Sequence, residues 1–139
     1  ESMDYIRKAL AQKSKIRSKW DNLGKKDEWE LRLQEIEEAS ENLEWNHAAI
    51  LFQRLNDDLE SNKESFLEAN ELLDFAKNEW LILKEKCEKI GIDILDEQRR
   101  FAEQNLAESI QALELGELES CLDKLGELDK IMEKLKRRV

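Results

Sequence analysis

One row of apolar side chains constrains the fold of this chain more than any other feature. The row advances in alternating steps of three and four residues, which keeps its members on one face of an α-helix. No glycine or proline interrupts it, so it predicts one continuous helix from about Asn46 to Lys89, with the polar stretch Glu60–Ser65 as its weak point. The row consists of Trp45, Ala48, Phe52, Leu55, Leu59, Asn62, Phe66, Ala69, Leu73, Ala76, Trp80, Leu83, Cys87 and Ile90.

Four shorter helices are predicted around this long one. Helix Asp4–Leu23 ends before Gly24, and a second begins near Asp27 and runs to a turn at Leu43–Asn46, where Asn46 is the candidate N-cap. After the long helix, Asp93 is the candidate cap of the fourth, and the fifth spans about Glu117–Arg137. The inward residues expected on the last two are Leu95, Phe101, Ala102, Leu106, Ile110, Leu113, Leu118, Cys121, Leu122, Leu125, Leu128, Met132 and Leu135.

An internal repeat organises these segments. A shift of 70 residues places the turn Leu43–Asn46 on Leu113–Gly116, and a shift of 67 places Gly24 on Gly91. We therefore predict an all-α chain of tandem three-helix units, residues 1–62 and 63–139, which share the helix 46–89. The alternative is a single helical bundle, formed if the long helix folds back at Glu60–Ser65.

Composition excludes several classes of protein. The 139 residues include no proline and only four glycines, which argues against a β-rich fold. The net charge of −10 disfavours nonspecific binding of nucleic acid, and no apolar run is long enough to cross a membrane. Cys87 and Cys121 fall on apolar helical positions, so we expect reduced core cysteines in a cytoplasmic protein.

No enzyme site emerges from the residue pattern. His47 is the only histidine, and Glu44-Trp-Asn-His47 is a single Glu-x-x-His motif, whereas a di-iron bundle needs two. Neither a paired-cysteine zinc motif nor a glycine-rich phosphate loop is present. We therefore expect no catalytic residue, no metal and no cofactor.

The candidate partner-binding residues are basic and aromatic. Residues 1–26 carry eight basic and three acidic groups, whereas residues 27–60 carry two basic and eleven acidic ones. The basic side chains either bind a partner, anionic lipid or nucleic acid, or complement the acidic second helix. Tryptophans near the ends of the second helix are candidate hot spots if they are exposed. The candidates are Trp29, Trp45, Arg7, Lys8, Lys13, Lys15, Arg17 and Lys19.

Five segments within residues 80–135 carry a resemblance to a known family. They are Glu85–Gly91, Asp96-Glu97, Ala107–Leu113, Gly116–Glu119 and Leu122–Leu135. Through these segments, residues 80–135 resemble the C-terminal helical lid of Hsp70-type chaperones. It implies a role in covering a client or docking a partner. No nucleotide-binding or β-sandwich domain accompanies it in this chain.

The sequence therefore favours a non-enzymatic protein–protein interaction module, lid-like or a scaffold segment of a larger protein. The first alternative is a homo-oligomerising coiled-coil segment, for example a homodimer, in which the Phe66–Ile90 part of the apolar row pairs with another copy. The second is peripheral binding of the basic first helix to anionic lipid or nucleic acid.

Overall fold

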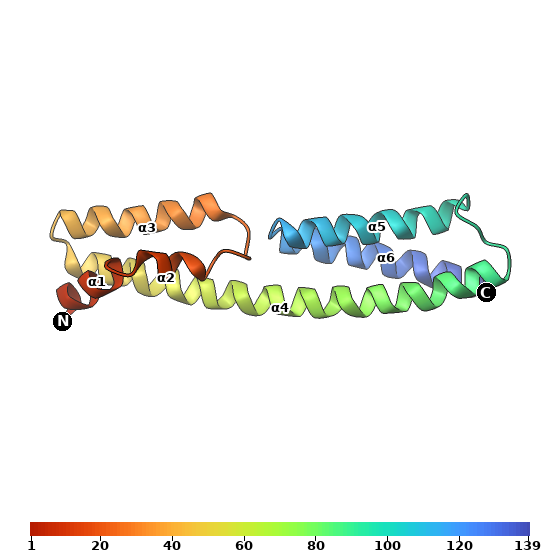
Figure 1. Ribbon diagram of the computed structural model, residues 1–139, viewed down its shortest axis with the longest axis horizontal. Coiled ribbons are helices and arrows are strands. Elements are labelled where there is room, and N and C mark those ends of the chain that lie inside the picture. Colours follow the sequence, from red (N-terminus) through yellow and green to blue (C-terminus); the bar gives the residue numbers. More distant parts are fainter. The chain divides into compact units, whose positions relative to one another are not determined.

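A computed structural model describes residues 1–139 and contains only helices (Figure 1). This confirms the prediction of an all-α fold. No helix combines the length and the apolar character that crossing a membrane requires. The helices are α1 (Ser2–Leu10), α2 (Lys13–Ser18), α3 (Lys26–Glu41), α4 (Trp45–Lys89), α5 (Glu97–Glu114) and α6 (Leu118–Arg138).

The chain divides into two compact units. Unit 1 is Glu1–Glu64 and contains α1, α2, α3 and the first part of α4. Unit 2 is Ser65–Val139 and contains the rest of α4 with α5 and α6. Helix α4 is helical throughout Glu60–Ser65, the stretch where the sequence allowed a break.

The predicted row on α4 is the buried face of that helix. Ten of its fourteen members are buried, from Ala48 to Cys87, and Asn62 and Phe66 between them are half-buried. Ile90 is an error of the sequence analysis, because it lies beyond the helix and is 54% exposed. Ile92 in the following loop takes its place in the core.

The first predicted helix is two helices. Ala11 and Gln12 separate α1 from α2, and Gln12 has a non-helical φ of −119°. The apolar spacing explains the break, because the step from Leu10 to Ile16 is six residues and leaves the alternation of three and four. Breaking the helix allows both Ile6 and Ile16 to be buried, while Leu10 is half-buried.

Several residues predicted to face inward are exposed instead. Leu95, Phe101 and Leu122 all lie on the surface. The predicted N-caps also differ. Helix α4 begins at Trp45, one residue before Asn46, and Asp96 rather than Asp93 caps α5 by accepting a hydrogen bond from the backbone of Arg99.

Two clusters form the core of unit 2. One joins Trp80 and Leu83 of α4 to Leu128, Met132 and Leu135 of α6, and Ala102 of α5 completes it. The other joins Ala69 and Leu73 of α4 to residues of α5 and α6, among them Cys121. Both clusters bury the α4 row against α5 and α6 of the same chain.

The two units repeat one helix–turn–helix geometry at a shift of 73 residues. Helices α3 and α5 end at Glu41 and Glu114, and α4 and α6 begin at Trp45 and Leu118. Leu43 (φ 61°) and Gly116 (φ 72°) both adopt the left-handed conformation. The hydrogen bond from Glu44 N to Ala39 O recurs from Glu117 N to Ala112 O, at 2.9 Å in both turns. These are Schellman-type helix ends.

The shift of 70 predicted from the sequence was therefore three residues too short. At 73, buried residues fall on buried residues: Ala48 on Cys121, Leu55 on Leu128, and Leu59 on Met132. At 70, buried Phe52 would fall on exposed Leu122. The error arose because Leu43 occupies a left-handed position that glycine occupies in the second copy, so the two turns do not look alike in sequence.

This register predicts which leucines of α6 support the fold. Replacing Leu128 by alanine should lower the free energy of unfolding by about 3 kcal/mol, because it opens a cavity in the core. Leu122→Ala should cost less than ~1 kcal/mol, because Leu122 is 45% exposed. Urea unfolding followed by circular dichroism measures both. Equal losses in the two variants would contradict the register.

Candidate functional site

Four of the six candidate basic residues contact neighbours within unit 1. Lys13 pairs with Glu37 at 3.1 Å, and Arg17 reaches both carboxylate oxygens of Glu30. The remaining contacts are Lys19 with Asn56 Oδ1 at 3.3 Å and the Arg7 guanidinium over the Trp45 ring at 5.5 Å. The side chains of Lys8 and Lys15 form no ion pair or hydrogen bond. The pairing with α3 corresponds to the charge-complementing alternative of the sequence analysis.

The candidate tryptophans are also engaged. Trp29 is 5% exposed and donates its indole N–H to Gly24 O at 3.2 Å, so its ring lies in the core. Trp45 is half-buried at the start of α4, beneath Arg7. A shallow groove there is lined by Trp45, Leu43, Asn46 and the first three residues of the chain. Of the eight candidates, the structure brings only Arg7 and Trp45 together.

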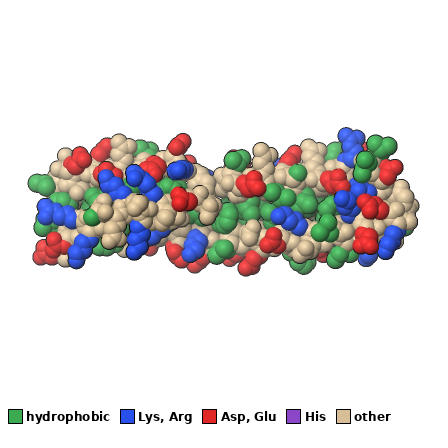
Figure 2. Space-filling view, in the orientation of Figure 1, with side chains coloured by type: hydrophobic (Ala, Val, Ile, Leu, Met, Phe, Trp, Pro, Cys, Tyr) green, Lys and Arg blue, Asp and Glu red, His purple; other side chains and the backbone are tan.

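Exposed apolar surface is concentrated in unit 2 instead. Sixteen large hydrophobic side chains are exposed, and twelve of them belong to this unit. Figure 2 shows hydrophobic side chains gathered over it. The twelve are Leu67, Leu72, Phe75, Leu81, Ile82, Ile90, Ile94, Leu95, Phe101, Leu115, Leu122 and Val139.

The loop between α4 and α5 is the main difference between the two copies. Gly24 and Gly91 both have a positive φ and are separated by 67 residues, whereas the following turns are separated by 73. Unit 2 therefore carries six additional residues between these points, four in the loop and two in α5. The longer loop exposes Ile94 and Leu95, which lie between Ile90 and Phe101 in the sequence. We call Ile90, Ile94, Leu95 and Phe101 the loop patch.

Local hydrogen bonds give this loop a defined conformation. Gly91 takes a φ of 89°, and Ile92 N donates to Cys87 O at 2.9 Å, which closes the end of α4. Ile92 then enters the core. Asp93 Oδ1 accepts from the backbone of Leu95 at 2.9 Å, and Asp96 begins α5.

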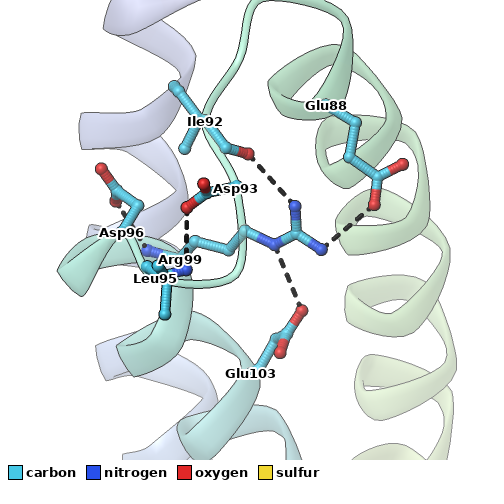
Figure 3. A network of polar contacts seen from close by, with 7 residues as sticks. All are labelled: Glu88, Ile92, Asp93, Leu95, Asp96, Arg99 and Glu103. Atoms are coloured by element: carbon cyan, nitrogen blue, oxygen red, sulfur yellow. Dashed lines mark hydrogen bonds and ion pairs between the residues drawn. The ribbon is translucent and has the colours of Figure 1, made fainter.

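Arg99 fastens the loop to the helices on either side (Figure 3). Its side chain is 3% exposed and donates Nη1 to Ile92 O at 3.1 Å and Nη2 to Glu88 Oε1 at 3.1 Å. Nε lies 3.4 Å from Glu103 Oε1. A buried guanidinium is tolerated because these acceptors compensate for its lost hydration. The loop is thereby tied to both α4 and α5.

In unit 1, a tryptophan donates the equivalent hydrogen bond to the preceding loop. Trp29, in the first turn of α3, donates to the carbonyl of Gly24 in the preceding loop. Arg99, in the first turn of α5, donates to the carbonyl of Ile92. The longer loop of unit 2 requires a longer and multiply bonded donor, which an arginine provides.

A second arginine closes the same end of unit 2 from α6. Arg138 donates Nη1 to Asp96 Oδ1 at 3.0 Å and Nη2 to Asp96 Oδ2 at 2.7 Å. These hydrogen bonds lower the pKa of Asp96 from 3.8 to about 2, and the backbone hydrogen bond of Arg99 acts in the same direction against the effect of burial. The carboxylate thus joins the N-terminus of α5 to the end of α6.

The site offers apolar contact rather than a reactive group. Burial raises the pKa of the Cys87 and Cys121 thiols, which keeps them protonated. No group of three metal-binding side chains comes together. An open depression of about 220 Å³ lies next to Arg99 and is lined by Glu88, Gly91 and Ile94. The arrangement can present Ile94 and Leu95 to another molecule in a fixed orientation.

Sequence reasoning missed this site for identifiable reasons. Leu95 and Phe101 fit helical spacing, which predicts core positions for both. Arg99 gives no signal, because arginine is usually exposed. The position of Asp96 before α5 was available as an N-cap signal, but Asp93 matched the same pattern. Comparisons with protein-family models, curated proteins and solved structures found no match for this chain.

The buried arginine leads to a stability prediction. Arg99→Met should lower the free energy of unfolding by about 2 kcal/mol, because the hydrogen bonds of a charged donor are lost. The amide of Leu95 should also exchange its hydrogen faster, since the loop loses its tie to Ile92 O. Arg100→Met is the matched control, because Arg100 is exposed and forms no ion pair. Similar effects of both substitutions would contradict the structural role of Arg99.

The Asp96–Arg138 pair predicts a defined pH dependence. The pKa of Asp96 is lowered in the folded chain, so the pair stabilises fully above pH 3.8 and loses its effect as the pH falls toward 2. Arg138→Gln should therefore destabilise the chain at pH 7 and make little difference at pH 2. A carbon-detected NMR titration should return the pKa of Asp96 toward 3.8 in this variant. An unchanged pKa would exclude Arg138 as the cause.

Proposed function

We propose that this chain is a non-enzymatic helical interaction module that docks a protein partner through the loop patch. The observation that carries the proposal is an apolar loop present in only one of two similar units and fixed by a buried arginine. Insertions on a repeated scaffold are common places for binding sites, because the scaffold remains intact while the loop varies.

Rigidity supports a binding role for the loop patch. If the backbone beneath exposed isoleucine and leucine side chains is already fixed, binding costs no backbone ordering entropy and only the rotamer entropy of the side chains is lost. Arg99 and Asp93 provide that order through hydrogen bonds to Ile92 O and from Leu95 N. A partner with a complementary apolar surface would gain the burial of Ile94 and Leu95, which are 65% and 78% exposed.

We further propose that the chain consists of tandem three-helix units in a cytoplasmic protein. The repeated turn geometry supports the tandem arrangement, and two free cysteines are compatible with a reducing compartment. The resemblance to the Hsp70-type lid fits the same module, since it covers the loop patch within residues 80–135. Binding of anionic lipid or nucleic acid by residues 1–26 is less favoured, because Lys13 and Arg17 are paired with α3.

Site-specific photocrosslinking tests the docking proposal. A photoreactive phenylalanine at Leu95 should capture a partner in cells, and the same group at Leu43 should not, although Leu43 is 70% exposed in a turn of unit 1. The captured protein is then purified and titrated with the chain by calorimetry. Burial of apolar surface should give a negative heat-capacity change on binding.

Substitutions decide whether the loop patch makes the contact. Ile94→Asp with Leu95→Asp should weaken binding by more than about tenfold, because two apolar contacts are lost and two charges must be desolvated. Leu43→Asp should leave the affinity unchanged. Equal binding by both variants, or a purified protein that does not bind the unmodified chain, would reject the proposal.

A further inference from the structure

A second apolar row lies on α4, outside the loop patch. Leu72, Phe75 and Ile82 are exposed by 53%, 63% and 60%, and they continue a spacing of three and four residues. The charged residues in the same row are Glu68, Glu79, Lys86 and Lys89. We call these seven residues the outer row. It differs from the buried row of α4, which α5 and α6 cover.

The neighbouring helix leaves the outer row open. Lys136 of α6 approaches Glu79 at 3.9 Å, and Ile82 lines an open groove of about 510 Å³ together with Lys86, Lys136 and Val139. Glu68 and Lys86 form no ion pair within the chain. Glu68 and Lys86 therefore lie on either side of the apolar centre of the row, and neither is paired with an opposite charge.

We propose that the outer row binds the outer row of a second copy of this chain in an antiparallel pair. The charges select this partner and orientation. In a parallel pair, Glu68, Glu79 and Lys86 would each face the same residue of the other copy, which is repulsive. Antiparallel pairing about a two-fold axis level with residue 77 brings Glu68 opposite the partner's Lys86, and Lys86 opposite the partner's Glu68.

The same register pairs two of the three apolar residues of each copy with each other. Leu72 lies opposite the partner's Ile82, and Phe75 lies opposite the partner's Glu79. Within each copy, Lys136 lies 3.9 Å from the Glu79 carboxylate and can keep it at the edge of the interface. Stable interfaces bury roughly 800 Å² per partner. Three apolar side chains are a small part of such an area, so the dimer is weak and depends on concentration.

This pairing differs from the coiled coil suggested by the sequence. That pairing required the Phe66–Ile90 part of the buried row, which unit 2 already uses for its own core. The outer row leaves that core intact and is independent of the loop patch. A chain could therefore form the dimer whether or not the loop patch binds a partner.

Sedimentation equilibrium of the full chain tests the proposal. The average mass should rise toward that of two chains as the concentration approaches about 1 mM, the range expected for weak association. Ile82→Glu should abolish this rise. Leu81→Glu is the matched control, because Leu81 is the adjacent residue on another face and is 61% exposed. A urea unfolding curve for each variant confirms that it folds.

Charge reversal tests the register. Glu68→Lys and Lys86→Glu should each weaken association about fivefold, because two attractive pairs become repulsive. The double variant should restore it, because the opposite charges meet again. The proposal is overturned by a monomer at every concentration, by equal effects of Ile82→Glu and Leu81→Glu, or by a double variant that does not recover.

Discussion

Burial of one face of α4 is the interaction on which the rest of the structure depends. Each unit covers part of that face, with Ala48, Phe52, Leu55 and Leu59 in unit 1 and the row from Ala69 to Cys87 in unit 2. A helix of 45 residues cannot be stabilised by backbone hydrogen bonds alone, because most helical stability in proteins comes from packing an apolar face. The short helices of each unit supply that packing, so their positions follow from α4.

The two units solve the same packing problem with different residues. Leu55 and Leu128 are equivalent and equally buried, and the turns before α4 and α6 share their hydrogen bonds. The loops that precede α3 and α5 differ, and each is fixed by a donor from the following helix. Trp29 donates one hydrogen bond to the short loop of unit 1, whereas Arg99 forms several hydrogen bonds that fix the longer loop of unit 2. This substitution allows unit 2 to carry an apolar loop in an ordered conformation.

Part of the charge in unit 1 forms ion pairs between its own helices. The basic residues of α2 face acidic residues of α3, as in the contacts of Lys13 with Glu37 and Arg17 with Glu30. Such exposed pairs contribute little stability each, but they select the neighbour of a helix. Unit 2 combines similar pairs with more exposed apolar side chains, and this surface is the basis of the proposed docking of a partner.

The sequence alone determined the helical class, the extent of α4 and its buried face, because spacing fixes which side chains share a face of one helix. It did not determine the break after Leu10, the shift of 73 residues or the exposure of Leu95, Phe101 and Leu122. Those features depend on which neighbouring helix covers each position, and spacing along one helix carries no information about its neighbours. The burial of Arg99 likewise required the tertiary structure, because its acceptors Ile92, Glu88 and Glu103 meet only after α4 and α5 have packed.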